Sequence, residues 1–456
     1  MKMLKKVKKK LLNLSEKTKI VLINIIGAFV IKGVSLIVSL LTTPTYITFF
    51  NNEIVLGIWF TILSVISWFL NFDLGIGNGL RNHLTKAYAE KDYKEAKKLI
   101  SSAYAVIGAV CIAIIVVVMI SFDYVEWNKF FRIDRRVVSE KALLTTVKIV
   151  FIGIVLQIFF KIISSILYAI QKSSINNAIS LATSLLILIV ISISPSSDNN
   201  HNLVFMAVIY DISVILPYII ASIVVFYSKR YRIIAPKLSL VSQRHATKVL
   251  VLGGSFFLVQ IFYMLIMSTN EYLITYCTNS GNVVEYRIYY QILTLGSTIC
   301  ALALTPVWSA ITKAIAEKDV EWIKKLYRKM IMGAVVGTAC EFLLILVLQN
   351  LFNIWLRDST ITVNYITAVS FAFLGSLMLF NAVFSNVANG VGKLRTQLVV
   401  FFSGIVVKIP LTVVMIRITD SWVGVVIATN IILLTYCIIQ PITLHRFFNS
   451  KSWNKK

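Results

Sequence analysis

Hydrophobic residues recur in long uninterrupted runs along the whole chain. Twelve runs are each long enough to cross the roughly 30 Å hydrocarbon core of a bilayer as an α-helix. Lipid offers no hydrogen-bond partner to a bare backbone amide, and the alternating pattern typical of outer-membrane strands is absent. The sequence therefore predicts an all-α integral membrane protein with twelve transmembrane helices. The predicted spans are residues 20–43, 56–80, 99–121, 142–170, 175–194, 203–227, 249–275, 285–311, 329–351, 363–389, 394–416 and 420–440.

Composition and charge agree with this class and add an orientation. Of the 456 residues 58% are hydrophobic and 14% are charged, and the mean hydropathy is +0.82. Most of the 45 Lys and Arg residues fall in the two tails and in alternate loops, so the positive-inside rule predicts that both termini face the cytoplasm. The net charge of +25 then reflects topology and attraction to anionic lipid, which argues against a nucleic-acid partner.

One charged segment occurs twice. TKAYAEKDYKEAKKL at 85–99 returns as TKAIAEKDVEWIKKL at 312–326, with ten of fifteen positions identical. Six predicted spans separate the copies, and an even number preserves orientation. We therefore expect two six-helix bundles related by a parallel pseudo-two-fold repeat, as in several transporters. A second, weaker similarity between the two halves relates AIQKSS at 169–174 to GVGKLR at 390–395.

The repeat and the loops divide the chain into five parts. Residues 1–19 are predicted to form a basic cytoplasmic tail, and the longest connector between the halves marks the boundary between two bundles. The remaining parts are an N-terminal bundle at 20–227, a cytoplasmic linker at 228–248, a C-terminal bundle at 249–440 and a cytoplasmic tail at 441–456.

Several ionisable side chains lie within the predicted spans. Each costs about 2.5 to 3.5 kcal/mol to place near the middle of a bilayer, so each requires a compensating environment. Polar stripes accompany the cations, which favours a wet cavity that would accept an anionic, phosphate-bearing lipid. The alternative is that the lysines snorkel or form internal ion pairs with a carboxylate. The cationic candidates for substrate binding are Lys32, Lys161, Arg287 and Lys408, and the buried carboxylates are Asp211 and Glu341.

A glycine-rich segment, NFDLGIGNGLRN at 71–82, ends the second predicted span. No strand precedes it, so it is not a nucleotide-binding fingerprint, and its glycines allow close helix packing or bending. Asp73 and Arg81 are expected to flank the inner mouth of the bundle, where they either pair with each other or meet substrate. With Asp211 and Glu341, they are the candidates for ion coupling or gating.

Catalytic and metal-binding motifs are absent from the sequence. There is no H-E-x-x-H, no G-x-S-x-G and no phosphate-binding loop, and the five cysteines and four histidines are scattered. The sequence therefore predicts neither an enzyme nor a metal site, and no cofactor.

Three segments together resemble a known family. FDLGIGNGLRNHLTKAYAEKD at 72–92, TPVWSAITKAIAEKD at 305–319 and NGVGKLR at 389–395 are similar to bacterial polysaccharide flippases, which translocate O-antigen and capsule repeat units. Their superfamily also contains multidrug and toxic-compound extruders. The resemblance implies a protein of the bacterial cytoplasmic membrane that moves undecaprenyl-pyrophosphate-linked oligosaccharide from the cytoplasmic to the periplasmic leaflet by alternating access.

The resemblance also implies roles and partners. Lys32, Lys161, Arg287 and Lys408 would belong to a basic lumen that receives the pyrophosphate, and a proton or sodium gradient would drive some members. A polysaccharide polymerase and glycosyltransferases would act on the same lipid-linked glycan.

Two other functions are compatible with parts of the sequence. A cation-coupled multidrug extruder would use Asp211, Glu341 or Asp73, but it would need more carboxylates than this chain supplies. A membrane enzyme such as a polysaccharide polymerase would need positioned acids or bases in a sizeable loop. The short predicted loops disfavour it.

Overall fold

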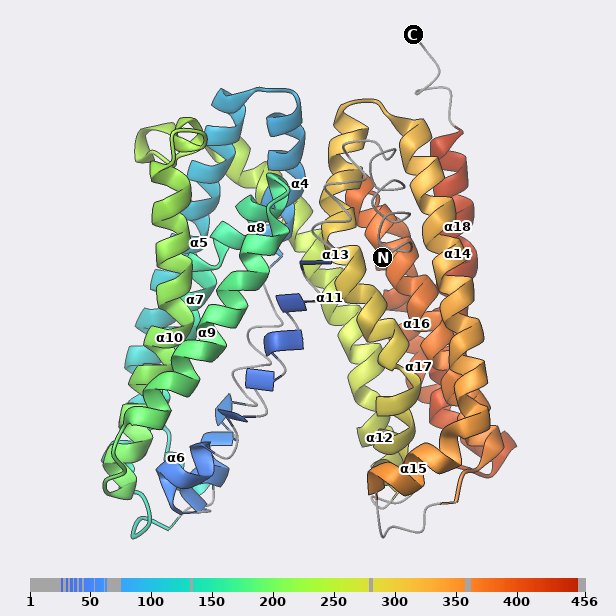
Figure 1. Ribbon diagram of the computed structural model, residues 1–456, viewed down its shortest axis with the longest axis horizontal. Coiled ribbons are helices and arrows are strands. Elements are labelled where there is room, and N and C mark those ends of the chain that lie inside the picture. Colours follow the sequence, from blue (N-terminus) through green and yellow to red (C-terminus); the bar gives the residue numbers. More distant parts are fainter. Residues whose placement is uncertain are drawn as a thin grey trace, which may run out of the picture. The chain divides into compact units, whose positions relative to one another are not determined.

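The computed structural model describes residues 26–449, apart from short gaps, and Figure 1 shows its helices. The described part contains α-helices and short 3-10 helices and no β-strand. Within the described residues, ten helices are long and apolar enough to cross a membrane, and each overlaps one of the predicted spans from residue 99 onward, although a break at Thr294 divides the span predicted at 285–311. The prediction of an all-α, multi-pass membrane protein is therefore confirmed, while about half of the residues in spans 20–43 and 56–80 are undescribed. The gaps are 28–29, 32, 36, 39–40, 43–44, 53, 61, 64–74, 132–133, 279–281 and 357–361.

The chain forms two compact units, residues 1–254 and 255–456. In the N-terminal unit, α10 packs along α7, and α4 packs against both α5 and α8. Its core is almost entirely aliphatic and aromatic, with Leu80, Ile100 and Ile163 fully buried. Its helices are α4 (Ile76–Ala89), α5 (Tyr93–Ser121), α6 (Trp127–Phe131), α7 (Glu140–Phe160), α8 (Ile162–Ala169), α9 (Ser173–Ile193) and α10 (Asn199–Tyr227), with 3-10 turns η1 (Phe122–Tyr124), η2 (Arg232–Ile234) and η3 (Leu238–Leu240).

The C-terminal unit is built around one central helix. α16 packs against α13, α14 and α18, and α17 lies along α18. A long helix, α11 (Gln243–Cys277), begins in the N-terminal unit and continues into this one. The other helices are α12 (Asn282–Leu293), α13 (Leu295–Ala316), α14 (Val320–Leu344), α15 (Leu348–Leu356), α16 (Tyr365–Val391), α17 (Arg395–Thr419) and α18 (Gly424–Phe448), with η4 (Ile345–Val347) after α14.

The first copy of the repeated segment is the turn between α4 and α5. Lys91 adopts a left-handed conformation with φ 59°, and the Asp92 amide donates to the Ala87 carbonyl at 2.9 Å. This contact satisfies a carbonyl that the end of α4 would leave unpaired. The Asp92 carboxylate then accepts from the Glu95 amide at 2.9 Å and caps the start of α5. Lys91 thus lies in the turn that ends α4, and Asp92 caps the start of α5.

The second copy forms the same turn between α13 and α14. Lys318 has φ 60°, and the Asp319 amide donates to the Ala314 carbonyl at 2.9 Å. The Asp319 carboxylate accepts from the Trp322 amide at 3.2 Å. The identical letters in the two units therefore encode identical backbone geometry.

The segments of the second, weaker similarity also form matching turns. Gln171 after α8 and Gly392 after α16 are both left-handed, with φ 60° and 72°. In each case the next amide reaches back to a helix carbonyl, from Lys172 at 2.7 Å and from Lys393 at 2.9 Å. Only the second turn uses glycine, the residue that adopts this conformation most readily.

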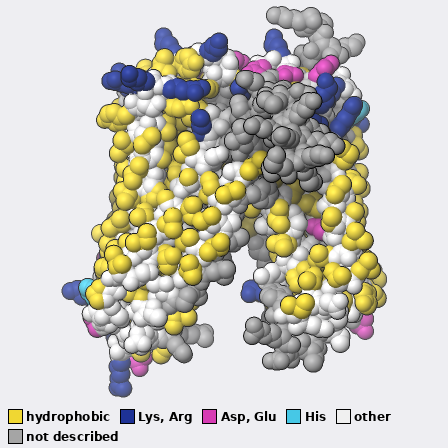
Figure 2. All heavy atoms as spheres, viewed as in Figure 1, with side chains coloured by type: hydrophobic (Ala, Val, Ile, Leu, Met, Phe, Trp, Pro, Cys, Tyr) yellow, Lys and Arg dark blue, Asp and Glu magenta, His cyan; other side chains and the backbone are white. Residues whose placement is uncertain are grey.

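Side chains on the surface separate by type. Figure 2 shows hydrophobic side chains along the flanks of the helices and Lys and Arg side chains gathered mainly at their ends. We call the end of the N-terminal unit that carries the α4–α5 turn and residues 228–248 its basic end. An apolar flank between charged ends is what a bilayer requires of a bundle of spans.

The aspartate caps can be tested by substitution. Asp319→Ala removes the acceptor at the start of α14, so we expect the free energy of unfolding to fall by about 1 kcal/mol. Asp92→Ala should cost a similar amount, while Asp319→Asn keeps a capping oxygen and should stay near wild type. Thermal unfolding of the detergent-purified protein measures the difference. An Asp319→Ala variant as stable as Asp319→Asn would contradict the assigned turn.

Candidate functional site

The eight ionisable candidates divide between the two units. Lys32 and Asp73 lie outside the described residues. Arg81, Lys161 and Asp211 lie in the N-terminal unit, and Arg287, Glu341 and Lys408 lie in the C-terminal unit. We describe the C-terminal group first because its contacts are the most complete.

Lys408 lies inside the C-terminal unit, at 3% exposure, on α17. Its amine donates to Asn270 Oδ1 of α11 at 2.7 Å and contacts Thr429 Oγ1 of α18. The carbonyl of Val425 lies 3.5 Å away. Asn270 in turn donates through Nδ2 to the hydroxyl of Tyr286 at 3.2 Å. We call these five residues the Lys408 network.

The Lys408 network supplies hydrogen-bond acceptors but no opposite charge. An ammonium group has three protons, and an amide, a hydroxyl and a carbonyl oxygen face it. No carboxylate of the described chain lies within 4.0 Å of its nitrogen, so the internal ion pair considered from the sequence is not formed with Glu341. At 3% exposure the side chain does not snorkel either. A buried amine surrounded only by neutral groups is electrostatically suited to an approaching anion.

Arg287 lies beside this network but on the surface. Its guanidinium makes a two-pronged ion pair with Glu271, with Nε–Oε1 at 3.0 Å and Nη2–Oε2 at 2.6 Å. Its side chain is 68% exposed, whereas Tyr286, the preceding residue, is buried in the network. Neighbouring residues of α11 and α12 thus form two cross-helix contacts. One is buried and neutral, and the other is exposed and charged.

Glu341 of α14 lies in a glycine-lined recess of the same unit. It is 6% exposed, and Oε2 accepts from the Ser376 hydroxyl of α16 at 3.2 Å. Oε1 is buried without a hydrogen-bond partner among the described residues. A Cβ atom added to Gly296 or Gly375 would lie 3.0 or 2.9 Å from the carboxylate, so the two glycines create the room that the side chain occupies.

Asp211 has a similar environment in the N-terminal unit. It lies on α10 at 9% exposure and faces Gly153 of α7, where an added Cβ would lie 2.0 Å from the carboxylate. No Lys or Arg of the described chain pairs with it. A buried carboxylate without a counter-charge is costly, and it is stable when protonated or when a cation binds.

The other two candidates of the N-terminal unit occupy helix junctions. Arg81 of α4 is 3% exposed, and its guanidinium carbon lies 4.5 Å from the centre of the Tyr168 ring on α8. The Tyr168 hydroxyl accepts from Asn176 of α9 at 2.8 Å, so this stack ties three helices together. Lys161 lies half-buried where α7 ends and α8 begins.

The sequence pattern did not identify the partners of these groups. Asn270 and Thr429 lie 138 and 21 residues from Lys408, and Gly153 lies on a different helix from Asp211. The spacing of polar residues along one helix marks a polar face but not the residue opposite it. In the searched part of the chain, no three His, Cys, Asp or Glu side chains gather as a metal site would require.

Comparison by sequence gives one relative with an ascribed role. The chain is 22% identical over 375 residues to a protein of Yersinia pseudotuberculosis to which export of O-antigen has been ascribed, covering 77% of this chain and 80% of the relative. No protein-family model matches the chain.

Comparison by structure shows the fold. A multidrug-resistance MATE transporter of the MOP superfamily, solved in an outward-facing conformation, has a TM-score of 0.75 at 12% identity over 97% of this chain and 98% of its own. A MOP superfamily transporter from Pyrococcus furiosus, described by the reversed polarity of its binding pocket, has a TM-score of 0.72 at 13% identity, over 96% of this chain and 98% of its own. The chain has the fold of these transporters. Its relatives are exporters and transporters rather than enzymes, as the sequence predicts.

The recess around Glu341 makes a stability prediction. An Ala side chain at Gly375 would lie 2.2 Å from the Leu293 carbonyl and would force α16 away from the end of α12. We expect Gly375→Ala to lower the free energy of unfolding by about 1 to 3 kcal/mol through overpacking. Gly333 of α14 has open space around it, so Gly333→Ala should be neutral or slightly stabilising. Thermal unfolding of both purified variants tests the packing, and equal melting temperatures would refute it.

Proposed function

We propose that the protein is a flippase that moves an undecaprenyl-pyrophosphate-linked oligosaccharide from the cytoplasmic to the periplasmic leaflet by alternating access. Lys408 carries this proposal, because it is a cation held inside a membrane bundle by neutral groups alone. A pyrophosphate would provide the missing negative charge when the surrounding helices open. The sequence relative with an ascribed role in O-antigen export supports the same class of substrate.

The proposed architecture has twelve spans in two six-helix bundles. The paired turns at Lys91 and Lys318 support a parallel pseudo-two-fold relation, with bundles at 20–227 and 249–440 joined by the linker at 228–248. In this arrangement the tails at 1–19 and 441–456 and the repeated turns face the cytoplasm, and the chain lies in the bacterial cytoplasmic membrane. A polymerase and glycosyltransferases would handle the same glycan before and after transport.

The proposed lumen contains Lys32, Lys161, Arg287 and Lys408. Arg287 would have to exchange Glu271 for substrate, because the two side chains are paired in this conformation. Lys408 would have to become accessible by separation of α17 from α18 or α11. These requirements fit a transporter that binds its substrate in one conformation and covers the site in another.

Asp211 and Glu341 are the proposed coupling groups. Each is a buried carboxylate without a cationic partner, so each is placed to exchange a proton or to accept a sodium ion as its surroundings change. Arg81 and Asp73 are the proposed gating residues; Arg81 lies in α4, and Asp73 lies outside the described residues. Burial of Arg81 against Tyr168 supports a structural part in that gate.

The second candidate function is a cation-coupled multidrug extruder. The fold shared with a multidrug-resistance MATE transporter and the two buried carboxylates favour it. It places the positive charge on the drug and the negative charge on the protein, so it gives Lys408 no role in binding. The behaviour of a Lys408 variant therefore separates the two functions.

Replacement of Lys408 by Met tests the flippase proposal. Met keeps most of the side-chain volume and removes a buried charge, a change that is often neutral or stabilising. The variant should accumulate in the membrane and unfold at or above the wild-type temperature. We expect surface polysaccharide to fall at least tenfold in a deletion strain complemented with Lys408→Met, measured by immunoblot of the extracted polymer.

Lys329→Met is the matched control, because Lys329 lies exposed on α14 and its loss should leave display unchanged. Normal display with Lys408→Met would remove the proposed anion site. Loss of drug resistance with intact display in the deletion strain would favour the extruder.

Glu341→Gln tests coupling. Glutamine keeps the shape and an acceptor for the Ser376 hydroxyl, but it neither titrates nor carries charge. In membrane vesicles, an imposed proton or sodium gradient should accelerate translocation of labelled lipid-linked glycan by the wild type and leave the variant unaffected. Glu321→Gln, at an exposed position at the start of α14, should keep the wild-type response. A gradient-stimulated Glu341→Gln variant would exclude Glu341 as the coupling group.

A further inference from the structure

A pocket of about 390 Å³ lies at the basic end of the N-terminal unit, and its lining residue Phe160 directly precedes Lys161. Its walls come from α5, α7 and α10, and its rim comes from the segment at 228–248. Tyr104, Phe159 and Phe226 supply most of the apolar wall, and Lys237 lies at the rim. The volume falls within the range of about 300 to 1,000 Å³ that is usual for small-molecule sites.

The aromatic wall is a packed cluster. The Tyr104 ring lies edge-on to Phe159 with centroids 5.5 Å apart and to Phe226 at 6.3 Å. Three helices thus contribute aromatic rings to the same apolar surface, and α7 adds a second ring, Phe160. Such a surface accommodates a hydrocarbon chain without any hydrogen-bond requirement.

Hydrogen bonds hold the rim in place. The Lys237 amide donates to Ser101 Oγ of α5 at 2.9 Å, and the Ser242 amide donates to Ser102 Oγ at 3.1 Å. The segment at 228–248 therefore lies along α5.

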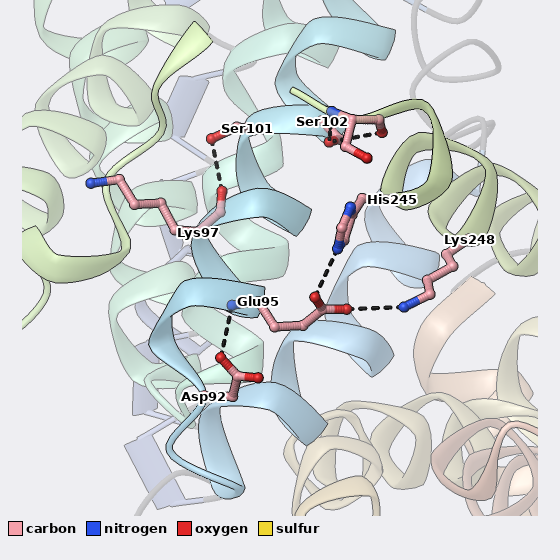
Figure 3. Close-up of polar contacts among 8 residues, drawn as sticks. Asp92, Glu95, Lys97, Ser101, Ser102, His245 and Lys248 are labelled. Carbon is pink, nitrogen blue, oxygen red and sulfur yellow. Dashed lines mark hydrogen bonds and ion pairs between the residues drawn. The ribbon is translucent and has the colours of Figure 1, made fainter. Parts of the chain in front are cut away.

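Glu95 of α5 anchors the first turn of α11. Its two carboxylate oxygens contact His245 Nε2 at 2.7 Å and Lys248 Nζ at 3.0 Å, and Figure 3 shows both side chains converging on it. Because the contacts at Ser101, Ser102 and Glu95 lie along α5, the position of the Lys237 backbone relative to the aromatic wall is set before any ligand arrives. The rim is preorganised.

The charged side chains of the segment at 228–248 are all basic. Between residues 228 and 248 the chain has six Lys or Arg residues and no Asp or Glu. Lys237 is exposed, and no carboxylate of the described chain lies within 4.0 Å of its amine. This rim suits the negatively charged head of a lipid.

Exposed apolar side chains accompany the positive ones. Leu238 is 89% exposed at the rim, and Ile233 is 54% exposed one 3-10 turn earlier. Apolar and basic side chains exposed on one segment are typical of a surface that lies in the headgroup layer of a membrane. The pocket therefore opens where phospholipid heads and acyl chains meet.

We propose that this pocket binds an anionic phospholipid of the surrounding bilayer, with an acyl chain among Tyr104, Phe159 and Phe226 and the phosphate at Lys237. The proposed occupant is a resident lipid of the bilayer rather than the transported glycan, and Lys161 of the proposed lumen is the sequence neighbour of the lining residue Phe160. Binding would fasten the segment at 228–248 to the N-terminal unit more firmly in membranes rich in anionic lipid.

Native mass spectrometry of the full-length protein in detergent tests the site, with phosphatidylglycerol or phosphatidylcholine as the added probe. The wild type should bind phosphatidylglycerol more tightly. Lys237→Ala should weaken that binding about fivefold, the equivalent of about 1 kcal/mol for one cation at a membrane surface, and leave phosphatidylcholine unchanged. Lys229→Ala is the control, because Lys229 is exposed in the same segment but does not line the pocket.

Ala105→Trp tests the apolar part. Ala105 lines the pocket, so the larger ring should fill it and reduce phosphatidylglycerol binding at least tenfold. Ala113→Trp, on an exposed position of α5, should bind as the wild type does. Equal affinity for the two phospholipids, equal effects of the two lysine variants, or full binding by Ala105→Trp would each overturn the proposal. Tighter binding of undecaprenyl phosphate than of phosphatidylglycerol at this site would overturn it in favour of the cargo.

Discussion

The absence of water from a bilayer-spanning bundle is the constraint on which both units depend. An ionised group placed there must find an opposite charge, a set of hydrogen-bond partners or a change in protonation, because the solvent supplies none of these. Neutral oxygens from α11 and α18 compensate the buried amine of Lys408. These neutral partners differ from a salt bridge in the charge that they leave on the site. A carboxylate partner would cancel the charge and leave nothing for a substrate. Amide and hydroxyl oxygens satisfy the protons of the amine and leave its positive field available to an anion.

The two buried carboxylates obey the same constraint through close packing. Each lies against glycine on a neighbouring helix, Gly153 for Asp211 and the pair Gly296 and Gly375 for Glu341. Glycine removes the side chain that would otherwise occupy the space, so the helices stay close while the carboxylate is enclosed. A charged group enclosed this tightly cannot be reached by a large organic cation without movement of a helix. A proton or a small metal ion is a more suitable partner, which is why we propose these residues for coupling rather than for cargo binding.

The features that could be predicted from the sequence are those encoded locally. Hydrophobic runs predicted ten spans that the structure describes. The repeated letters A-E-K-D predicted a repeat, and the structure shows that they form the same turn twice, because a helix end, a left-handed residue and an aspartate cap all lie within a few positions. The contacts of Lys408 and Arg287 could not be predicted in this way. Asn270 approaches Lys408 from 138 residues away, and Glu271, which neutralises Arg287, gave no signal along α12. Residue spacing identifies which face of a helix is polar, but tertiary packing decides what that face meets.

The contacts of the segment at 228–248 could not be predicted from the sequence either. As a charged connector between two hydrophobic halves it is expected to be a loose tether, yet Ser101, Ser102 and Glu95 bind it along α5. The backbone of Gly253 then packs against Gly75, and α11 continues past Gly254 into the next unit without a break. The covalent connection between the units is therefore a helix whose first turns belong to the N-terminal unit.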